Sequence, residues 1–140
     1  MLTFKIYTNA ALTVEFTGNL VATQNVDGST GRQDSQVWLG STAAGKVLQA
    51  DSDPGVDQIT VGIVDAAPGS GHPASDVTLA LTQGGLDTAV PGDPLDLGVE
   101  IQSGVGNAVS FWIGIEDSTG VIGTSTELQV TSVTLREAAA

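Results

Sequence analysis

The segment DSDPGVD places Asp51, Asp53 and Asp57 at the alternate spacing by which a loop presents oxygen atoms to calcium. An EF-hand loop that began at Asp51 would need an oxygen ligand at its fifth position and glutamate at its twelfth, where this chain has Gly55 and Gly62. The pattern therefore excludes an EF-hand. A solvated turn is the favoured interpretation, a looser calcium site is the alternative, and we expect no metal site and no cofactor.

His72 is the single histidine, so any Ser-His-Asp arrangement would depend on it. Ser70 and Asp76 lie close to it in the sequence. However, His72 precedes Pro73 in the glycine-rich segment 66–75, which would give a general base no rigid support. We expect an exposed loop histidine, no catalytic residues and no enzymatic activity.

The most regular strand pattern covers residues 95–115, where two runs of alternating apolar residues flank the glycine-containing segment 103–107. This period of two predicts a β-hairpin with one apolar face, which would form the centre of the core. The expected cross-strand pairs are Ile101 with Val109, Val99 with Phe111, Leu97 with Ile113, and Leu95 with Ile115.

The other face of this hairpin is polar except for one large aromatic residue. With Gln102 paired to Ala108, Trp112 lies opposite Gly98 on the solvent side. A tryptophan there either covers a bare glycine backbone or contacts a partner. Trp38 takes a similar position if its two chain neighbours face the core. We therefore predict Trp112, Gly98 and Trp38 as partner contacts; the alternative is that a crossing loop or the N-terminal strand covers both tryptophans.

Composition limits the class of protein. The 140 residues fit one domain, spanning 1–140, and the chain has no cysteine for disulfides or zinc-thiolate sites. The net charge is −12, because only Lys5, Arg32, Lys46 and Arg136 oppose sixteen carboxylates. Four scattered cations form no basic stripe, so binding to nucleic acid or to an anionic membrane is not expected.

Strand-like segments follow one another at short spacing along the chain. They are expected at 2–7, 12–16, 20–26, 36–40, 46–50, 59–64, 76–83, 121–122 and 127–137, besides the hairpin. A phase slip at Ser132 indicates a bulge, and Ala138–Ala140 is expected to be a free end. Strong helix formers are scarce. The prediction is an all-β, antiparallel, immunoglobulin-like β-sandwich, with a β-barrel as the alternative.

Two short segments resemble each other, VGIVD at 61–65 and IGIED at 113–117. Five residues establish no repeat, but equivalent strands in two sheets would produce such a likeness.

Three groups of segments carry a resemblance to a protein family. TVEFTGNL, DGSTG and VWLGS lie in the first third, PGVDQITVGIVDAAPGSG in the middle, and GVIGTSTELQV near the end. With them the chain resembles small virion structural proteins of tailed bacteriophages. The resemblance implies an immunoglobulin-like sandwich that decorates a capsid or belongs to a tail or baseplate, and it assigns no functional residue.

The resulting expectation is a capsid decoration protein that binds the major capsid protein or other virion proteins as a homo-oligomer and so stabilises the assembled head. The strand Met1–Tyr7, with Leu2 and Phe4, is a candidate to pair with a neighbouring chain. The alternative is a carbohydrate- or receptor-binding module of a tail, with Trp38 or Trp112 as a stacking platform. The N-terminus lacks the pattern of a secretory signal, so we expect synthesis in a host cytoplasm and assembly into a virion.

Overall fold

A computed structural model describes residues 2–120 and 122–140 of the chain, which fold into antiparallel strands joined by loops and short 3₁₀ turns. Valine, isoleucine and threonine at alternating positions favour strands, and few residues favour helix. The strands are β1 (Lys5–Tyr7), β2 (Gln33–Gly40), β3 (Lys46–Ala50), β4 (Thr60–Asp65), β5 (Val77–Ala80), β6 (Leu95–Asp96), β7 (Glu100–Gln102), β8 (Val109–Ile115), β9 (Leu128–Ser132) and β10 (Leu135–Ala139). The 3₁₀ turns are η1 (Ala74–Asp76), η2 (Gly84–Asp87) and η3 (Val105–Asn107).

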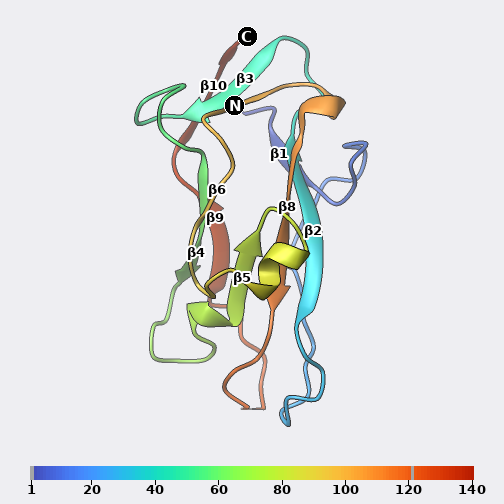
Figure 1. Cartoon of the computed structure of the whole chain (residues 1–140), viewed down its shortest axis with the longest axis vertical. Helices are drawn as coiled ribbons and strands as arrows, with labels where there is room; N and C mark the ends of the chain where they lie inside the picture. Colours follow the sequence, from blue (N-terminus) through green and yellow to red (C-terminus); the bar gives the residue numbers. More distant parts are fainter. Residues whose placement is uncertain (1, 121) are drawn as a thin grey trace.

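One layer is a four-stranded sheet in the order β1-β2-β8-β5, on the right in Figure 1. Its two longest strands, β2 and β8, pair over seven residues, from Gln33 opposite Ile115 to Leu39 opposite Val109. β5 pairs with the other side of β8, from Val77 opposite Ile115 to Ala80 opposite Trp112. β8 is therefore an inner strand with a partner on each side.

The second layer consists of two three-stranded sheets, in the orders β10-β3-β7 and β6-β4-β9. Backbone hydrogen bonds continue the ladder from one to the other: Asp51 N–H donates to the Thr134 carbonyl at 2.9 Å, and Val133 N–H to the Thr60 carbonyl at 3.0 Å. β9 and β10 thus act as one interrupted strand beside β4 and β3. The loop 51–59 leaves the layer at the interruption.

The core lies between the two layers. Phe111, Leu48, Ile59 and Ile101 are nearly inaccessible to solvent and come from both layers. The alternation in β8 buries Phe111 and Ile113, while Trp112 between them faces outward. The three sheets do not close into a barrel, so the predicted all-β antiparallel sandwich is confirmed.

The predicted hairpin at 95–115 is wrong. β6 pairs with β4 and β7 with β3, whereas β8 pairs with β2 and β5. The segment around η3 carries the chain from the second layer into the four-stranded sheet, beginning at Gly104 with φ 110°. The two apolar runs therefore face each other across the core instead of lying side by side.

Other segments differ from the expectation as well. The predicted strand at 12–16 is reduced to one bridge between Tyr7 and Glu15, and 20–26 forms no strand. Ala138 and Ala139 lie in β10 opposite Val47 and Lys46, so the predicted free end is wrong for them. Of the strand expected at 121–122, the first residue lies outside the described residues, and so does Met1.

Within the part of the chain that the structure describes, no helix has the length and apolar character needed to cross a membrane.

Candidate functional site

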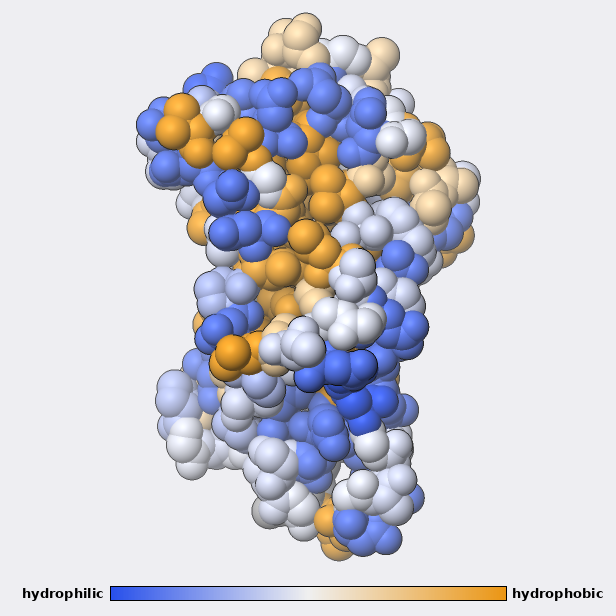
Figure 2. Space-filling model, in the orientation of Figure 1, coloured by the Kyte–Doolittle hydropathy of each residue, from blue (hydrophilic) through white to orange (hydrophobic). Residues whose placement is uncertain are grey.

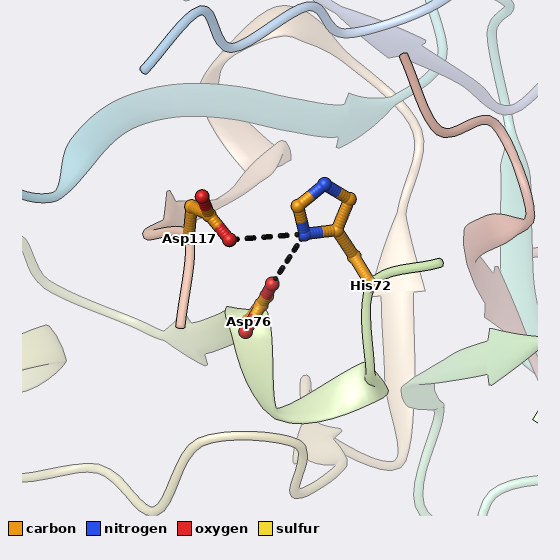
Figure 3. Close-up of side chains that lie close together, drawn as sticks. All are labelled: His72, Asp76 and Asp117. Atoms are coloured by element: carbon orange, nitrogen blue, oxygen red, sulfur yellow. Dashed lines mark hydrogen bonds and ion pairs between the residues drawn. The ribbon is translucent and has the colours of Figure 1, made fainter. Parts of the chain in front are cut away.

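The most concentrated group of metal-ligating side chains lies at the end of the sandwich where β8 finishes and β5 begins. His72 precedes η1, Asp76 is the last residue of η1, and Asp117 follows β8 (Figure 3). The pairing of Val77 with Ile115 brings these segments together. The site therefore depends on the β5–β8 contact.

The ring Nδ1 of His72 lies between the two carboxylates. It is 2.8 Å from Oδ2 of Asp76 and 3.2 Å from Oδ1 of Asp117, and one ligand atom from each residue lies within 4.8 Å of the other two. The Nε2 side of the ring points away from both acids (Figure 3). The group presents one nitrogen and two oxygens to a common point.

Asp76 is the buried member of the group, with 4% of the residue exposed. Its backbone is fixed, because its N–H donates to the Pro73 carbonyl at 3.0 Å and its carbonyl accepts from Glu116 N–H at 2.9 Å. Its second carboxylate oxygen accepts hydrogen bonds from the backbone N–H and the hydroxyl of Ser118. A buried carboxylate with this many donors has a defined orientation.

Asp117 is held by the turn that follows it. The N–H and the hydroxyl of Thr119 both donate to its Oδ1 at 2.8 Å, and its own N–H donates to Oε1 of Gln24. The hydrogen bonds from Thr119, with a smaller contribution from the charge of His72, lower the pKa of Asp117 below its usual value. Asp117 is thus an anion poised beside the imidazole.

A third acid, Glu127, holds the backbone of His72. The His72 N–H donates to Oε1 of Glu127 at 2.6 Å, and the Ser125 hydroxyl donates to the same carboxylate. These hydrogen bonds, that of Ser125 foremost, lower the pKa of Glu127. Gly71 has φ +66°, and a Cβ there would collide with Glu127, so this close approach requires glycine.

A cavity of about 210 Å³ adjoins the group, lined by residues that include Asp76, Asp117, Ser118 and Arg32. The Arg32 guanidinium is already paired: Nε lies 2.6 Å from Oδ1 of Asp34, and Nη1 lies 2.9 Å from Oδ1 of Asp87. The local charge beside the cavity is therefore dominated by carboxylates.

The arrangement does not match a Ser-His-Asp triad, in which the serine hydroxyl contacts the ring nitrogen opposite the aspartate. The hydroxyls of Ser118 and Ser125 instead donate to Asp76 and Glu127. The prediction of an exposed histidine is wrong, because the ring is partly buried and paired with Asp76, a residue whose closeness in the sequence did not by itself predict a contact. Asp117 was missed: only the register of β5 on β8 relates it to Asp76.

Within the described residues, the three aspartates of the segment 51–57 do not bring their carboxylate oxygens within 4.8 Å of one another, as His72, Asp76 and Asp117 do with their ligand atoms. Asp57 accepts a hydrogen bond from the Ser52 hydroxyl, and the Asp53 carbonyl accepts the N–H groups of Val56 and Asp57. The segment is a hydrogen-bonded turn.

The predicted partner residues occupy different places. Trp112 pairs with Gln36 and Ala80, not with Gly98, because Gly98 lies in the other layer and bonds to Ile59. Trp38 pairs with Ser110 and Tyr7. Trp38 is expected to face outward if its two chain neighbours face the core, and Val37 and Leu39 are both buried there. Both tryptophans are half-buried on the outer face of the four-stranded sheet.

The two N-terminal residues predicted as partner contacts differ in their exposure to solvent. Phe4 is 6% exposed and packs in the core, whereas Leu2 is 38% exposed. β1 is an edge strand, but its outer side already binds the segment after it, because Phe16 N–H donates to the Ile6 carbonyl at 2.8 Å. Its role in pairing with another chain stays a prediction.

Comparison of the chain with protein-family models, with curated proteins and with solved structures finds no match.

Proposed function

We propose that this protein is a structural binding protein that docks on other proteins through the outer face of its four-stranded sheet. More specifically, we propose that the protein decorates a bacteriophage capsid and binds coat subunits of the assembled head. One observation carries it: the two tryptophans of the chain lie on this face of the neighbouring strands β2 and β8.

The register makes the two tryptophans diagonal neighbours. Trp38 lies opposite Ser110 and Trp112 lies opposite Gln36. Diagonal neighbours of this kind lie about 7–8 Å apart, which is within the reach of aromatic side chains. Tryptophan is enriched among the residues that contribute most to protein interfaces, because it buries a large rigid surface and keeps one hydrogen-bond donor. The pair is a suitable anchor for a partner surface.

Two elements of the chain border the pair. Leu12 lies against Gly40 at one end of the face, and η2 lies against Ala80 at the other, with Leu86 buried. The tryptophans between them remain half-exposed. A partner that covered them would bury aromatic surface between segments of the chain that are already ordered, so little conformational entropy would be lost.

Binding to the assembled shell alone would stabilise it by mass action. The acidic surface contributes solubility, because the net charge of −12 disfavours self-aggregation. Such binding requires a folded protein that presents the two tryptophans, and it requires no catalytic step.

A carbohydrate- or receptor-binding tail module is the second candidate. Gln36 and Ser110 share the outer face with the two rings and offer amide and hydroxyl groups beside them. Aromatic faces with adjacent hydrogen-bonding groups are suited to sugars.

The test combines location with binding. Particles purified from the phage or lysogen that encodes the chain are imaged with antibody label and by reconstruction, and density on the head is expected. Density confined to the tail would favour the second candidate, and absence from particles would contradict both forms of the virion proposal. A glycan array read with wild type and with Trp112→Ala separates sugar binding from protein binding.

Substitution of Trp112 or Trp38 by alanine should weaken binding to heads that lack the protein by about thirtyfold, since loss of a central aromatic contact costs about 2 kcal/mol. Co-sedimentation of labelled protein with such heads measures the change. Val64→Ala is the matched control, because Val64 is an exposed strand residue of the other layer. Equal binding by all three variants would contradict docking through this face.

A further inference from the structure

We propose that His72, Asp76 and Asp117 form a binding site for a divalent transition-metal ion, with Zn²⁺ or Mn²⁺ as the occupant. The site is independent of the tryptophan face: it lies at the end of β8, beyond Ile115, and shares no residue with that face. Its effect would be to join the loop before β5 to the loop after β8.

The two distances from the histidine nitrogen to the carboxylate oxygens agree with binding to one ion. Metal–ligand bonds of about 2.1 Å at right angles place neighbouring ligand atoms about 3.0 Å apart, and tetrahedral angles place them about 3.4 Å apart. The Nδ1 atom of His72 lies 2.8 Å from the Asp76 oxygen and 3.2 Å from the Asp117 oxygen. The three ligand atoms lie within 4.8 Å of one another, so an ion beside the ring nitrogen would draw the two carboxylate oxygens toward it.

The types of ligand select the class of ion. An imidazole nitrogen with two carboxylate oxygens suits zinc, manganese or ferrous iron, whereas calcium prefers six to eight oxygens. Magnesium likewise favours oxygen ligands. The group offers a nitrogen and two oxygens, and the chain has no cysteine thiolate. A transition metal that accepts nitrogen and oxygen ligands, such as zinc or manganese, therefore fits best.

A hydrogen bond from the ring accounts for only one of the two carboxylates that lie close to Nδ1 of His72. Nδ1 carries at most one proton, and one N–H makes one well-aligned hydrogen bond, yet two carboxylate oxygens lie within 3.2 Å of this atom. One of the carboxylates is almost fully buried, which makes its charge costly without a close cation. A divalent ion would neutralise both acids and leave Nε2 as the protonated nitrogen.

The surroundings fix the ligands in the way that outer-shell groups do in metal sites. Ser118 donates to Asp76, Thr119 donates to Asp117, and Glu127 holds the backbone of His72. The cavity of about 210 Å³ that Asp76 and Asp117 line has room for water molecules next to the two carboxylates.

The single histidine allows a direct test. Full-length protein, freed of metal with a chelator and dialysed, is labelled with ¹⁵N, and its imidazole nitrogens are followed by long-range ¹H–¹⁵N NMR during titration with ZnCl₂. We expect the Nδ1 resonance to move to the metal-bound range at one equivalent of zinc while Nε2 stays protonated. An imidazole spectrum that zinc leaves unchanged would overturn the proposal.

Thermal unfolding supplies the second measurement. Zinc or manganese at about a hundredfold excess over the dissociation constant should raise the Tm by about 5 °C or more, and calcium should not. His72→Ala and Asp117→Asn should each bind zinc at least about tenfold more weakly by calorimetry. Asp53→Asn is the matched control, because it removes the same charge from an acidic turn away from the site.

These variants keep Asp76 and its hydrogen bonds from Ser118, and circular dichroism checks that each is folded before zinc is added. Equal zinc affinity in His72→Ala and wild type would show that the ion binds the acidic surface elsewhere and would overturn the site. Wild-type protein that binds zinc but does not bind heads would contradict the proposed function alone, and wild-type protein that binds heads but not zinc would contradict this site alone.

Discussion

An inner strand of each layer, β4 and β8, carries a similar short sequence in different surroundings. β4 contains VGIVD at 61–65 and lies between β6 and β9, whereas IGIED at 113–117 begins in β8, which lies between β2 and β5, and ends in the turn after it. On the inner face the strands are alike, since Val61 and Ile113 are both buried in the core. Their outer faces differ.

The two outer-face glycines show the difference. Gly114 lies directly under the Arg32 side chain, which ion pairs to Asp34 and Asp87 hold in place. Gly62 lies in an open hollow of about 310 Å³, where the nearest atom to an added Cβ is 3.8 Å away, in Pro94. Two similar short sequences therefore carry a covered polar surface in one layer and an open apolar surface in the other.

The ends of the two strands differ in the same way. Asp65 accepts the N–H of Ala67 at 2.9 Å and so closes a simple turn. Asp117 makes the equivalent turn contact with Thr119 and also faces His72. An ordinary turn aspartate becomes part of a site only where a second segment is brought against it.

Truncation of the shared inner face should have the largest effect. Ile113→Ala is expected to lower the free energy of unfolding by about 3 kcal/mol, and Val61→Ala by about 2 kcal/mol, because both leave cavities and the second removes fewer carbon atoms. Urea unfolding followed by circular dichroism measures both. A loss below about 1 kcal/mol for either variant would mean that the two inner faces are not equivalent.

Alanine substitutions of Gly114 and Gly62 should change the free energy of unfolding by intermediate amounts, and in different directions. Gly114→Ala should cost about 1–2 kcal/mol, because the new Cβ would lie 2.7 Å from Cδ of Arg32 and would displace a side chain held by two ion pairs. Gly62→Ala should be neutral or stabilising by up to about 1 kcal/mol, because the site is open and alanine restricts the unfolded chain. Equal effects of the two substitutions would contradict the assigned difference between the outer faces.

The smallest effect concerns pH. Hydrogen bonds from Arg32 lower the pKa of Asp34 in the folded protein. A lowered pKa stabilises the fold above the unfolded value of about 3.9, and this contribution is lost as the pH falls through the lower folded value. Asp34→Asn should therefore cost about 0.5 kcal/mol at pH 7 and reduce the acid-induced fall in Tm below about pH 4. Melting curves from pH 7 to pH 2 test this, and identical acid profiles for variant and wild type would contradict it.

Alternation predicted the strands and their inner faces but not their partners. Phe111 and Ile113 face the core as expected, and so do Leu97 and Ile101. A period of two is the same whether two strands lie side by side or face each other across a sandwich, so it could not exclude the hairpin. The left-handed backbone at Gly104 and the turn η3 decide in favour of the crossing.

The candidate site was even less accessible to sequence reasoning. His72 and Asp76 are four residues apart and could be related directly, whereas Asp117 reaches them only through the pairing of β5 with β8. The functional importance assigned to Trp112 came from its outward position, which the structure retains, but its predicted neighbour Gly98 belongs to the opposite layer. Local pattern identifies which face a residue occupies, while contacts between distant segments need the topology.

The interruption of the second layer has a practical consequence. The loop 51–59 protrudes at the upper left in Figure 1. In the same region of Figure 2, polar and apolar groups lie side by side on the surface. Its ends are pinned by backbone bonds from Asp51 to Thr134 and from Ile59 to Gly98, and Val56 within it is 64% exposed. Because the entropy cost of lengthening such a loop grows slowly, foreign peptides grafted here should project from an intact scaffold. The domain thus offers a site for antigen or tag display that leaves both the tryptophan face and the histidine cluster undisturbed.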